Sequence, residues 1–526
     1  MKNKLILLTL LGIVLFGCTS QFEEINTNPN FMEVAPSINI LTYTQRYYCG
    51  SILGDVWLNY NESSSIAGQV TKIRYIDETR YSYREGTVNS LWDRIYTNIG
   101  TNLNKIIEYE SGEDGNTNMM AVAMIYKAHC FQVLTDHLGD IPFSEAYKAA
   151  EGVYYPAYDA QKDVYDALIK EVQTAVAMIN ENPSAKDSWG GNDMFFAGNM
   201  TKWKKFGNSL LLRMAIRLSY IDQAKAAPII SGILSNPANV MESNDDNLIF
   251  EWPGGNYREP LAAAEIGRKD YALCSYIMSV LKETNDPRLT IYAAPAPQPD
   301  EENGDYKGMP PGISVAMSNM SEYAPNSISP VGQRYNSQPN ADGITCLMRY
   351  SEIEFIRAEA IERGIIQGDA KAAYENAIRA SMKENGATDV DAYLAQAKVA
   401  YESTELPNLL FASNALTNAS PENNACANPA VAASVKLQKI AYQKWLALFT
   451  TGAEAWAEVR RTDIPVIGPA VGAIGIDYPH NRAPFRWIYA LSESTNNPTN
   501  YEKALTKVQD FYWGEKMYWD VRTGVN

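Results

Sequence analysis

Aromatic side chains set among amides and charges are the residues of this chain with the clearest binding chemistry. Between residues 57 and 83 the rings occur at irregular spacing that no amphipathic helix would produce: Trp57, Tyr60, Tyr75, Tyr81 and Tyr83. Asn59, Asn61, Gln69 and Arg74 lie between them. An aromatic ring stacks on the apolar face of a pyranose, while amides and charges form hydrogen bonds with its hydroxyls. The segment therefore predicts part of a sugar-binding surface, although a peptide groove would use similar residues.

A second aromatic group, which includes Tyr335, lies at about residues 235–345 in a segment rich in Pro, Gly, Asn and Tyr. Long loops inside compact proteins are usually functional or disordered, and the aromatic content here favours function. Packing is the commoner role of any single ring, so the prediction concerns the set. The candidate ligand-binding residues are Trp57, Tyr60, Tyr75, Tyr83, Trp252, Tyr257, Tyr306 and Tyr323.

The motifs of common catalytic sites are absent from the sequence. It contains no phosphate-binding glycine loop, dinucleotide fingerprint, HExxH or GxSxG. His129 and His137 are too far apart to share a metal along one helix, and His129 is expected to be a core residue. The stretch Asp114–Asn118 begins like a calcium loop but lacks the glycine and the late glutamate of one. We expect no catalytic residue, no metal and no cofactor.

Carboxylate pairs need separate treatment because glycosidases use two carboxyl groups. Among 61 Asp and Glu residues some pairs arise by chance, and these are candidates only on that basis: Asp245/Asp246, Glu352/Glu354 and Glu359/Glu362. Asp136 and Asp140 flank the end of a predicted helix, where carboxylates cap backbone N–H groups. We predict a protein that is not an enzyme and keep a secreted helical glycosidase as an alternative.

Helical hairpins are the elements that would position these residues. In Lys436–Thr462, apolar residues recur every three to four positions and Gly452 stands where the first helix should end. Trp445 and Trp456 lie on the apolar faces of the two helices and are expected to pack in the core. One hairpin cannot bury both of its faces, so further hairpins must stack on it. Similar hairpins are predicted at about residues 87–138, 158–220 and 344–386.

The hairpin at about 344–386 carries small residues where its helices cross and a period of roughly 34 residues, as tetratricopeptide repeats do. Its helices are expected at Ile344–Gly364 and Asp369–Gly386, and another helix at Thr87–Tyr109. Short strands are expected around Asn247–Trp252. The sequence therefore predicts a mainly α fold of tetratricopeptide-like hairpins, with long irregular loops and a few short strands over one face.

The N-terminus has the features of an export signal. Lys2 and Lys4 precede the apolar run Leu5–Phe16, which is too short to span a bilayer. Leu15–Cys18 resembles a bacterial lipobox, although Phe16 departs from its usual small residue. We therefore expect residues 1–17 to be a lipoprotein signal peptide, Cys18 to be lipidated, and residues 18–526 to form one domain. An ordinary cleaved secretion signal is the alternative.

Charge and cysteine content narrow the classes of partner. The formal net charge of −16 argues against nucleic acid and anionic membrane surfaces, which attract clusters of Lys and Arg. Five cysteines follow Cys18 at wide spacing without a CxxC motif: Cys49, Cys130, Cys274, Cys346 and Cys426. This pattern fits neither a disulfide scaffold nor a zinc site. We expect buried thiols, with one disulfide pair left open.

An ordered set of motifs resembles the SusD/RagB-like outer-membrane lipoproteins of Bacteroidota over nearly the whole chain. The motifs are Phe22–Asn30, Thr135–Ala146, Tyr155–Tyr165, Met200–Ser219, Asp286–Leu289, Tyr306–Gly312, Arg349–Gly364, Arg460–Thr462 and Arg482–Tyr489. Glutamates behind Cys18 also resemble the surface-export signal of such lipoproteins. The resemblance implies four tetratricopeptide-like hairpins, with the Asp, Arg and Trp of these motifs in caps, buried pairs and packing.

The resemblance also implies a function at the cell surface. Proteins of this family act as the lid of a SusC-like TonB-dependent barrel, capture oligosaccharides and deliver them for import. We therefore expect an oligosaccharide ligand, a SusC-like partner, a lipid-anchored location on the exterior of the outer membrane and no nucleic acid. Oligopeptide cargo and a structural lid without a ligand of its own are the alternatives. The family's ligand residues vary, so no motif position transfers as a binding residue.

Overall fold

The computed structural model describes residues 35–184, 189–302, 304–411, 425–470, 472–474, 480–508 and 512–526. The predicted signal peptide, Cys18 and the motif Phe22–Asn30 lie outside the described residues. The described chain is mainly helical with short two-stranded β-pairs, which confirms the predicted fold class. Within these ranges, every helix is too short or too polar to span a lipid bilayer.

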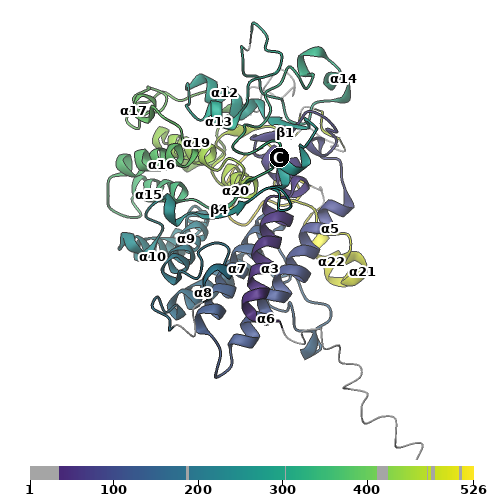
Figure 1. Ribbon diagram of the computed structural model, residues 1–526, viewed down its shortest axis with the longest axis vertical. Helices are drawn as coiled ribbons and strands as arrows, with labels where there is room; N and C mark the ends of the chain where they lie inside the picture. Colours follow the sequence, from purple (N-terminus) through teal and green to yellow (C-terminus); the bar gives the residue numbers. More distant parts are fainter. Residues whose placement is uncertain are drawn as a thin grey trace, which may run out of the picture.

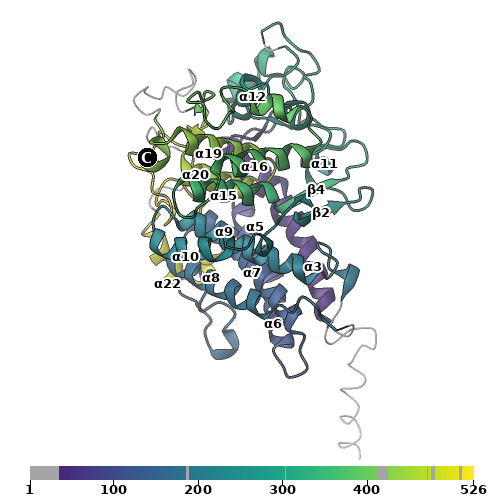
Figure 2. The ribbon, with the colours of Figure 1, turned by 90° about the vertical axis from the view of Figure 1, so that its left-hand side faces the viewer.

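Helical hairpins form the body of the described chain (Figures 1 and 2). They are α6–α7 (Thr101–Glu110, Thr117–Leu138), α8–α9 (Gln161–Met178, Met200–Leu218), α15–α16 (Tyr350–Glu362, Ala370–Asn385) and α19–α20 (Val435–Ala447, Gly452–Thr462). Helix α7 packs against α8, and α15 packs against both α9 and α19, so the hairpins share one core. Helix α10 (Gln223–Leu234) extends the second hairpin along α9.

Residues at the helix ends satisfy backbone groups that the helices leave unpaired. Asn116 Oδ1 accepts a hydrogen bond from the N–H of Met119 at 3.0 Å, where α7 begins. Asp369 Oδ1 does the same for Ala372 at 3.0 Å at the start of α16. Gly386 ends that helix with a φ of 72°, a left-handed conformation that costs glycine little. The boundaries of α16 therefore follow from local sequence.

Two predicted helices are too long. Residues 344–348 belong to strand β4 (Gly343–Met348), which pairs antiparallel with β2 (Leu248–Trp252), and α15 begins only at Tyr350. The predicted helix Thr87–Tyr109 is divided into α5 (Glu85–Asp93), the π-helical segment η4 (Arg94–Gly100) and α6. Apolar periodicity alone does not register such changes of helical type.

Gly452 begins α20 and does not end α19, which stops at Ala447. A Cβ at this position would lie 2.3 Å from Asn59 Oδ1 and 2.7 Å from the backbone N of Ser64. The N–H of Gly452 donates to Asn59 Oδ1 at 3.0 Å. The glycine is therefore required by a close approach of the N-terminal segment to the last hairpin.

Irregular segments with short elements cover the hairpins. The N-terminal elements are α3 (Ser37–Tyr48), the π-helical η1 (Cys49–Leu53) and η2 (Val56–Ser63), and α4 (Ser64–Ile66). The segment predicted as mostly loop contains α11 (Pro260–Ala264), α12 (Ser275–Glu283), α13 (Leu289–Tyr292) and α14 (Val315–Ser318). The remaining short α-helices are α17 (Val390–Leu394), α18 (Pro429–Ala432), α21 (Glu493–Asn496) and α22 (Pro498–Leu505).

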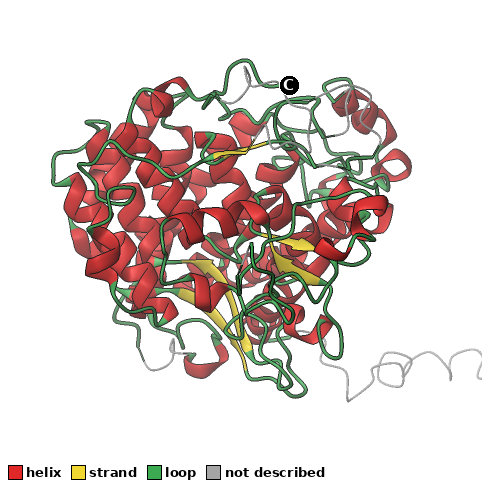
Figure 3. Ribbon diagram, turned by 90° about the horizontal axis from the view of Figure 1, so that it is seen from above, coloured by secondary structure: helices red, strands yellow, loops and turns green. Residues whose placement is uncertain are grey.

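Two further strand pairs and several 3-10 turns join these segments. Strand β1 (Val70–Lys72) pairs antiparallel with β3 (Tyr271–Leu273), and β5 (Leu410–Phe411) pairs parallel with β6 (Val466–Ile467). Single 3-10 turns occur at Glu78–Arg80, Ala149–Glu151, Gly190–Asn192, Pro237–Asn239, Asn244–Asp246 and Ser321–Tyr323. Figure 3 shows the short strands among loops beside the helical body.

Buried ion pairs connect the hairpins to one another. Arg217 of α9 pairs with Asp136 of α7 and with Glu454 of α20, and all of these side chains are at most 5% exposed. Arg213, one turn earlier, forms two hydrogen bonds with Glu352 of α15, at 2.7 and 2.6 Å. Each arginine therefore joins helices that belong to different hairpins.

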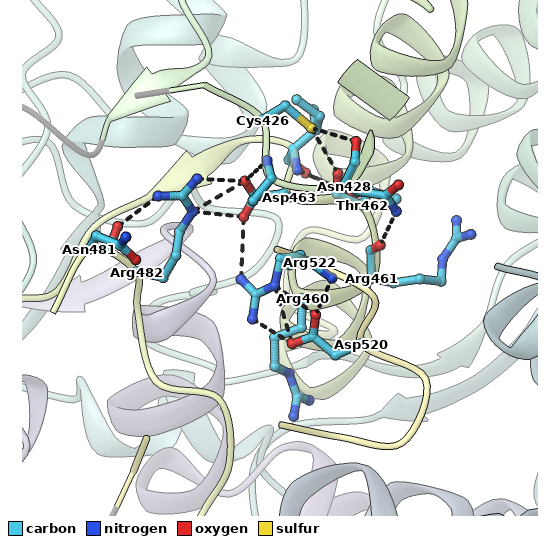
Figure 4. A network of polar contacts seen from close by, with 12 residues as sticks. Cys426, Asn428, Arg460, Arg461, Thr462, Asp463, Asn481, Arg482, Asp520 and Arg522 are labelled. Atoms are coloured by element: carbon cyan, nitrogen blue, oxygen red, sulfur yellow. Dashed lines mark hydrogen bonds and ion pairs between the residues drawn. The ribbon is translucent and has the colours of Figure 1, made fainter. Parts of the chain in front are cut away.

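A second set of ion pairs holds the C-terminal segment against α20 (Figure 4). Asp463, which follows α20, accepts from Arg482 at 2.8 Å and pairs with Arg522 at 3.3 Å. Arg522 also pairs with Asp520 at 2.7 Å. Arg461 points the other way along α20 and pairs with both Glu359 and Glu458 at 2.5 Å. The arginines of the sequence motifs are thus structural.

Packing residues predicted from the last hairpin and from α7 are confirmed. Trp445, Trp456 and His129 are at most 1% exposed. His129 lies 3.1 Å from the hydroxyl of Tyr48 and 3.2 Å from Arg213. The five described cysteines are free thiols, and all but Cys426 are fully buried.

Asp136 and Asp140 differ from each other in role. Asp140 accepts from the N–H of Gln161 at 2.8 Å and thus caps α8, as predicted. Asp136 was predicted to be a cap as well, but it is a buried partner of Arg217 and also accepts hydrogen bonds from Tyr165 and Trp519. Glu352 and Glu359, considered as a glycosidase's carboxylates, are likewise held by arginines.

Replacing Arg217 with Met should lower the free energy of unfolding by about 3–5 kcal/mol, because it leaves Asp136 buried without its cation and leaves Glu454 with only the more distant Arg213, at 3.6 Å. The exposed pair Lys204–Glu181 provides the control, and Lys204→Met should cost less than about 1 kcal/mol. Urea unfolding followed by circular dichroism measures both. Equal losses in the two variants would contradict the structural role of Arg217.

Candidate functional site

A small second core supports the loop that carries Tyr75. Ile73 and Ile76 pack there with Ala272, Met309, Ile313 and Ile328, apart from the main core. Tyr75 itself has a φ of 53°, in the left-handed region that residues other than glycine seldom adopt, and its side chain is 68% exposed. The buried isoleucines on both sides hold the loop, so the Tyr75 ring projects into solvent.

Trp57 and Tyr75 form one row with three cationic side chains. The Arg84 Cζ lies 5.1 Å from the centroid of the Trp57 ring, and the Arg268 Cζ lies 5.3 Å from that of Tyr75. The Lys72 Nζ stands between the rings, 5.4 Å from Trp57 and 5.8 Å from Tyr75. These distances are typical of cation–π contacts. We call these five residues the Trp57–Tyr75 face.

The position of Trp57 is fixed by Asp55 at the start of η2. Asp55 Oδ1 accepts hydrogen bonds from the backbone N–H of Trp57 at 2.8 Å and of Leu58 at 3.1 Å. Its other oxygen accepts from Arg94 at 3.0 Å. Trp57 nevertheless keeps 40% of its surface exposed. The ring is therefore presented by a helix start that hydrogen bonds hold in place.

An open cleft of about 500 Å³ adjoins Trp57. Its polar lining comes from the start of η2 and from α5 with the residues around it: Asp55, Arg84, Glu85, Thr87, Ser90 and Arg94. A flat ring beside a polar, solvent-open cleft can stack on an apolar ligand face and form hydrogen bonds around it. The arrangement suits a ligand with many hydroxyl or charged groups.

Glu78 lies beneath the face and holds two of its cations. This carboxylate is 1% exposed and pairs with Lys72 at 3.2 Å and with Arg84. Behind Lys72, Tyr271 donates to Asn61 Oδ1 at 2.7 Å. One buried carboxylate thus orients both cations next to Trp57.

Tyr60 and Trp252, two of the predicted candidates, are buried. Tyr60 is 3% exposed and packs edge-on against Tyr271. Trp252 is 6% exposed in strand β2, where its Nε1 donates to Thr345 Oγ1 at 2.9 Å. Neither ring has a free face, so we exclude both from the candidate site. Tyr81 and Tyr335 of the same two segments are also buried.

Tyr257 is 55% exposed but belongs to another patch. The centroid of its ring lies 5.2 Å from Cζ of Arg46, a residue of α3. The same helix carries the exposed Tyr43, whose ring stacks on that of Tyr47 with 5.5 Å between the centroids. We call Tyr43, Arg46, Tyr47 and Tyr257 the α3 strip. Its helical part was not predicted from the sequence, although the i, i+3, i+4 spacing of Tyr43, Arg46 and Tyr47 is a signal of one helix face.

The last three predicted candidates, Tyr83, Tyr323 and Tyr306, lie outside the Trp57–Tyr75 face. Tyr83 is 39% exposed, and burial with Glu85 and Tyr501 nearby raises its pKa. Tyr323 is half-buried against the small core that supports Tyr75. Tyr306 is half-buried against the main core. Among the predicted candidates, the structure brings only Trp57 and Tyr75 together in one cation-flanked row. The cations Lys72, Arg84 and Arg268 were not predicted, because their approach depends on the tertiary fold.

The described residues offer little to a metal. No group of three or more His, Cys, Asp or Glu side chains in these ranges could hold a metal ion. In the stretch considered as a calcium loop, Asn116 caps α7.

The sequence matches a known protein family over most of its length. The family model is SusD-like, described as "Starch-binding associating with outer membrane", and it matches residues 29–489. No curated protein matches the chain significantly.

Solved structures of SusD homologues share the fold. One from Bacteroides uniformis has a TM-score of 0.76 and 24% identity, covering 93% of this chain and 100% of its own. One from Bacteroides thetaiotaomicron has a TM-score of 0.74 and 25% identity, with the same coverage. A chitin-binding SusD homologue from Flavobacterium johnsoniae has a TM-score of 0.70 and 24% identity, covering 92% of this chain and 96% of its own.

A buried carboxyl beside the site makes stability depend on pH. Burial, with the nearby charge of Glu78, raises the pKa of Glu62 from 4.5 to about 8. The unfolded chain therefore loses this proton at lower pH than the folded chain does, so Glu62 lowers stability as pH rises from about 4.5 to 8.

Glu62→Gln keeps the shape of the protonated carboxyl and should remove this contribution. We expect the variant to melt at a higher temperature than the wild type at pH 8.5 and at the same temperature at pH 4.5. Glu108→Gln on the exposed surface of α6 is the control and should change neither value. Melting temperatures measured by circular dichroism across this range test it, and a pH-independent difference would contradict the burial argument.

Proposed function

Because this chain belongs to the SusD-like family of outer-membrane-associated, starch-binding proteins, we propose that it binds oligosaccharides at the cell surface and passes them to a SusC-like TonB-dependent transporter. The family assignment supports an outer-membrane association and a binding role. The oligosaccharide ligand, the SusC-like partner and the outward orientation are our proposals for this chain.

The Trp57–Tyr75 face is the observation that carries the ligand proposal. Its two rings are 40% and 68% exposed, although burial is the usual state of large aromatic side chains in this protein. Exposed aromatic rings beside polar clefts provide stacking area for sugars at low entropic cost. Arg84, Arg268 and the cleft next to Trp57 supply hydrogen-bond donors around the rings.

Glycan is favoured over peptide as the ligand class. The family description names starch, and two of the similar structures are named as chitin-binding proteins. Peptide recognition would more often use an unpaired strand edge or a continuous apolar groove. The cleft beside Trp57 is instead open to solvent, and charged and hydroxyl side chains contribute to its lining.

We also propose that the protein is not an enzyme. Members of the SusD-like family are binding proteins. The carboxylates considered for glycoside hydrolysis support this: Glu352 and Glu359 are held by Arg213 and Arg461 in the interior. A carboxylate that is buried and engaged by an arginine has no substrate within reach.

For the membrane attachment, we propose a signal peptide at residues 1–17, a lipid anchor on Cys18 and one SusD-like helical domain over residues 18–526. The support is the lipobox-like sequence at the end of an apolar run too short to span a bilayer. The net charge of −16 gives no support for attachment through anionic lipid headgroups.

Trp57→Ala and Tyr75→Ala should each weaken oligosaccharide binding by about 5- to 30-fold, the equivalent of losing about 1–2 kcal/mol of stacking. Isothermal titration with the best ligand of a panel of soluble polysaccharides and oligopeptides measures the change. Tyr154→Ala, which removes a 70% exposed ring elsewhere, is the matched control and should bind normally.

The same panel distinguishes the cargo classes. Binding of oligopeptides without any polysaccharide would refute glycan as the ligand class. Normal polysaccharide binding by both Trp57→Ala and Tyr75→Ala would show that the ligand binds elsewhere. Both variants should melt at the wild-type temperature, because their rings are exposed.

Cys18→Ala should release the full-length protein from the membrane fraction when it is expressed in a Bacteroidota host. The reason is that the variant has no thiol to carry the acyl chains that hold it there. Fractionation followed by immunoblotting measures the release, and the purified variant should bind ligand as the mature protein does. A variant that stays in the membrane fraction would refute the lipid anchor.

A further inference from the structure

The surroundings of the Trp57–Tyr75 face are basic in a chain that is acidic as a whole. The chain has 45 Lys and Arg residues against 61 Asp and Glu residues. The cations within the face, lining its cleft or adjacent in sequence are Lys72, Arg74, Arg84, Arg94, Arg268 and Lys269. The carboxylates of the same region are fewer: Asp55, Glu78, Glu85 and Asp270. Glu62, buried next to Glu78, adds little negative charge because burial raises its pKa to about 8. Asp77 and Arg80 pair with each other.

The ion pairs around the Trp57–Tyr75 face do not neutralise all of its cations. Glu78 alone serves both Lys72 and Arg84, so one carboxylate neutralises two cations. Arg74 and Lys269 are exposed and form no ion pair with any residue in the described ranges. Glu265, which lies beneath Asp270 and accepts from its N–H at 2.9 Å, adds less than a full negative charge, because burial raises its pKa to about 7.

Two partly exposed guanidinium groups lie where a stacked ligand would bind. Arg84 and Arg268 border Trp57 and Tyr75 respectively, and their side chains remain 48% and 52% exposed. Each guanidinium is engaged by one carboxylate and carries further N–H donors. A sugar ring on Trp57 or Tyr75 would therefore have its substituents next to guanidinium groups.

We propose that the ligand of the Trp57–Tyr75 face is an acidic oligosaccharide, whose carboxylate or sulfate groups bind Arg84 and Arg268 while its rings stack on Trp57 and Tyr75. The inference rests on the proposed oligosaccharide-binding function and specifies its ligand class. Guanidinium groups match the planar, two-oxygen geometry of carboxylate and also bind sulfate oxygens. A neutral glucan would offer these guanidinium groups hydroxyl oxygens but no opposite charge.

The test compares acidic with neutral probes on the purified mature protein. Polygalacturonate supplies carboxylates, chondroitin sulfate supplies carboxylates and sulfates, dextran sulfate supplies sulfates, and soluble starch and chitin oligosaccharides carry no charge. Affinity electrophoresis at 20 and 300 mM NaCl ranks them. We expect an acidic probe to bind best and to weaken at high salt because the ions screen its charge, while any neutral binding is unaffected. Polygalacturonate against dextran sulfate tells carboxylate from sulfate recognition.

Charge-neutralising variants then locate the binding site. Arg84→Gln with Arg268→Gln should weaken the acidic probe by about tenfold or more and leave any neutral probe unchanged. Arg74→Gln with Lys269→Gln removes unpaired exposed charges, so it cannot disturb the fold through a lost ion pair, and should reduce the salt dependence. Arg46→Gln of the α3 strip, which also removes a cation beside an exposed tyrosine, is the matched control and should bind as the wild type does.

The outcomes separate this inference from the function on which it rests. Starch or chitin oligosaccharides that bind more tightly than every acidic probe, with binding lost in Trp57→Ala, would overturn the acidic ligand and keep the proposed function. Acidic binding that Arg46→Gln weakens as much as the combined Arg84→Gln and Arg268→Gln variant does would overturn the assignment to this face. Failure of every polysaccharide to bind would overturn both.

Discussion

Charged side chains buried in this protein require partners, and the ion pairs that they form connect different helical hairpins. Arg217 on α9 reaches Asp136 on α7 and Glu454 on α20, which belong to three different hairpins. Desolvating an ion costs several kcal/mol, and the cost is offset only when the geometry of the pair is kept. A hairpin that shifted would leave such a charge unpaired. The ion pairs therefore select one arrangement of the hairpins among the many that apolar packing alone would allow.

Contacts of the last hairpin also fix the positions of two segments that extend to the protein surface. Asp463 ties the C-terminal segment to α20 through Arg482 and Arg522, while Gly452 lets the N-terminal segment lie against the start of α20. That N-terminal segment includes η2, the element that carries Trp57. The exposed ring is thus part of a chain segment whose position is set by the core. This accounts for an aromatic face on irregular structure whose position is fixed by contacts with the core.

Local patterns in the sequence were sufficient for the hairpins but not for the site. Helix α16 could be predicted to within a residue, because Asp369 and Gly386 satisfy its ends by short-range hydrogen bonds and backbone conformation. Tyr60 and Trp252 could not be recognised as buried, because their covering residues come from distant segments. Lys72 joins Trp57 and Tyr75 only after β1 pairs with β3, some 200 residues later in the chain. Family resemblance gave the fold class and left the ligand contacts open.

We propose that the ligand binds on the Trp57–Tyr75 face. A crystal structure of the protein with the tightest-binding oligosaccharide of the panel would show where the sugar rings lie. We predict sugar rings in van der Waals contact, at about 4 Å, with Trp57 or Tyr75 and with Arg84 or Arg268 at their rim. Ligand density on the α3 strip or on the helical hairpins, with the Trp57–Tyr75 face vacant, would contradict the account.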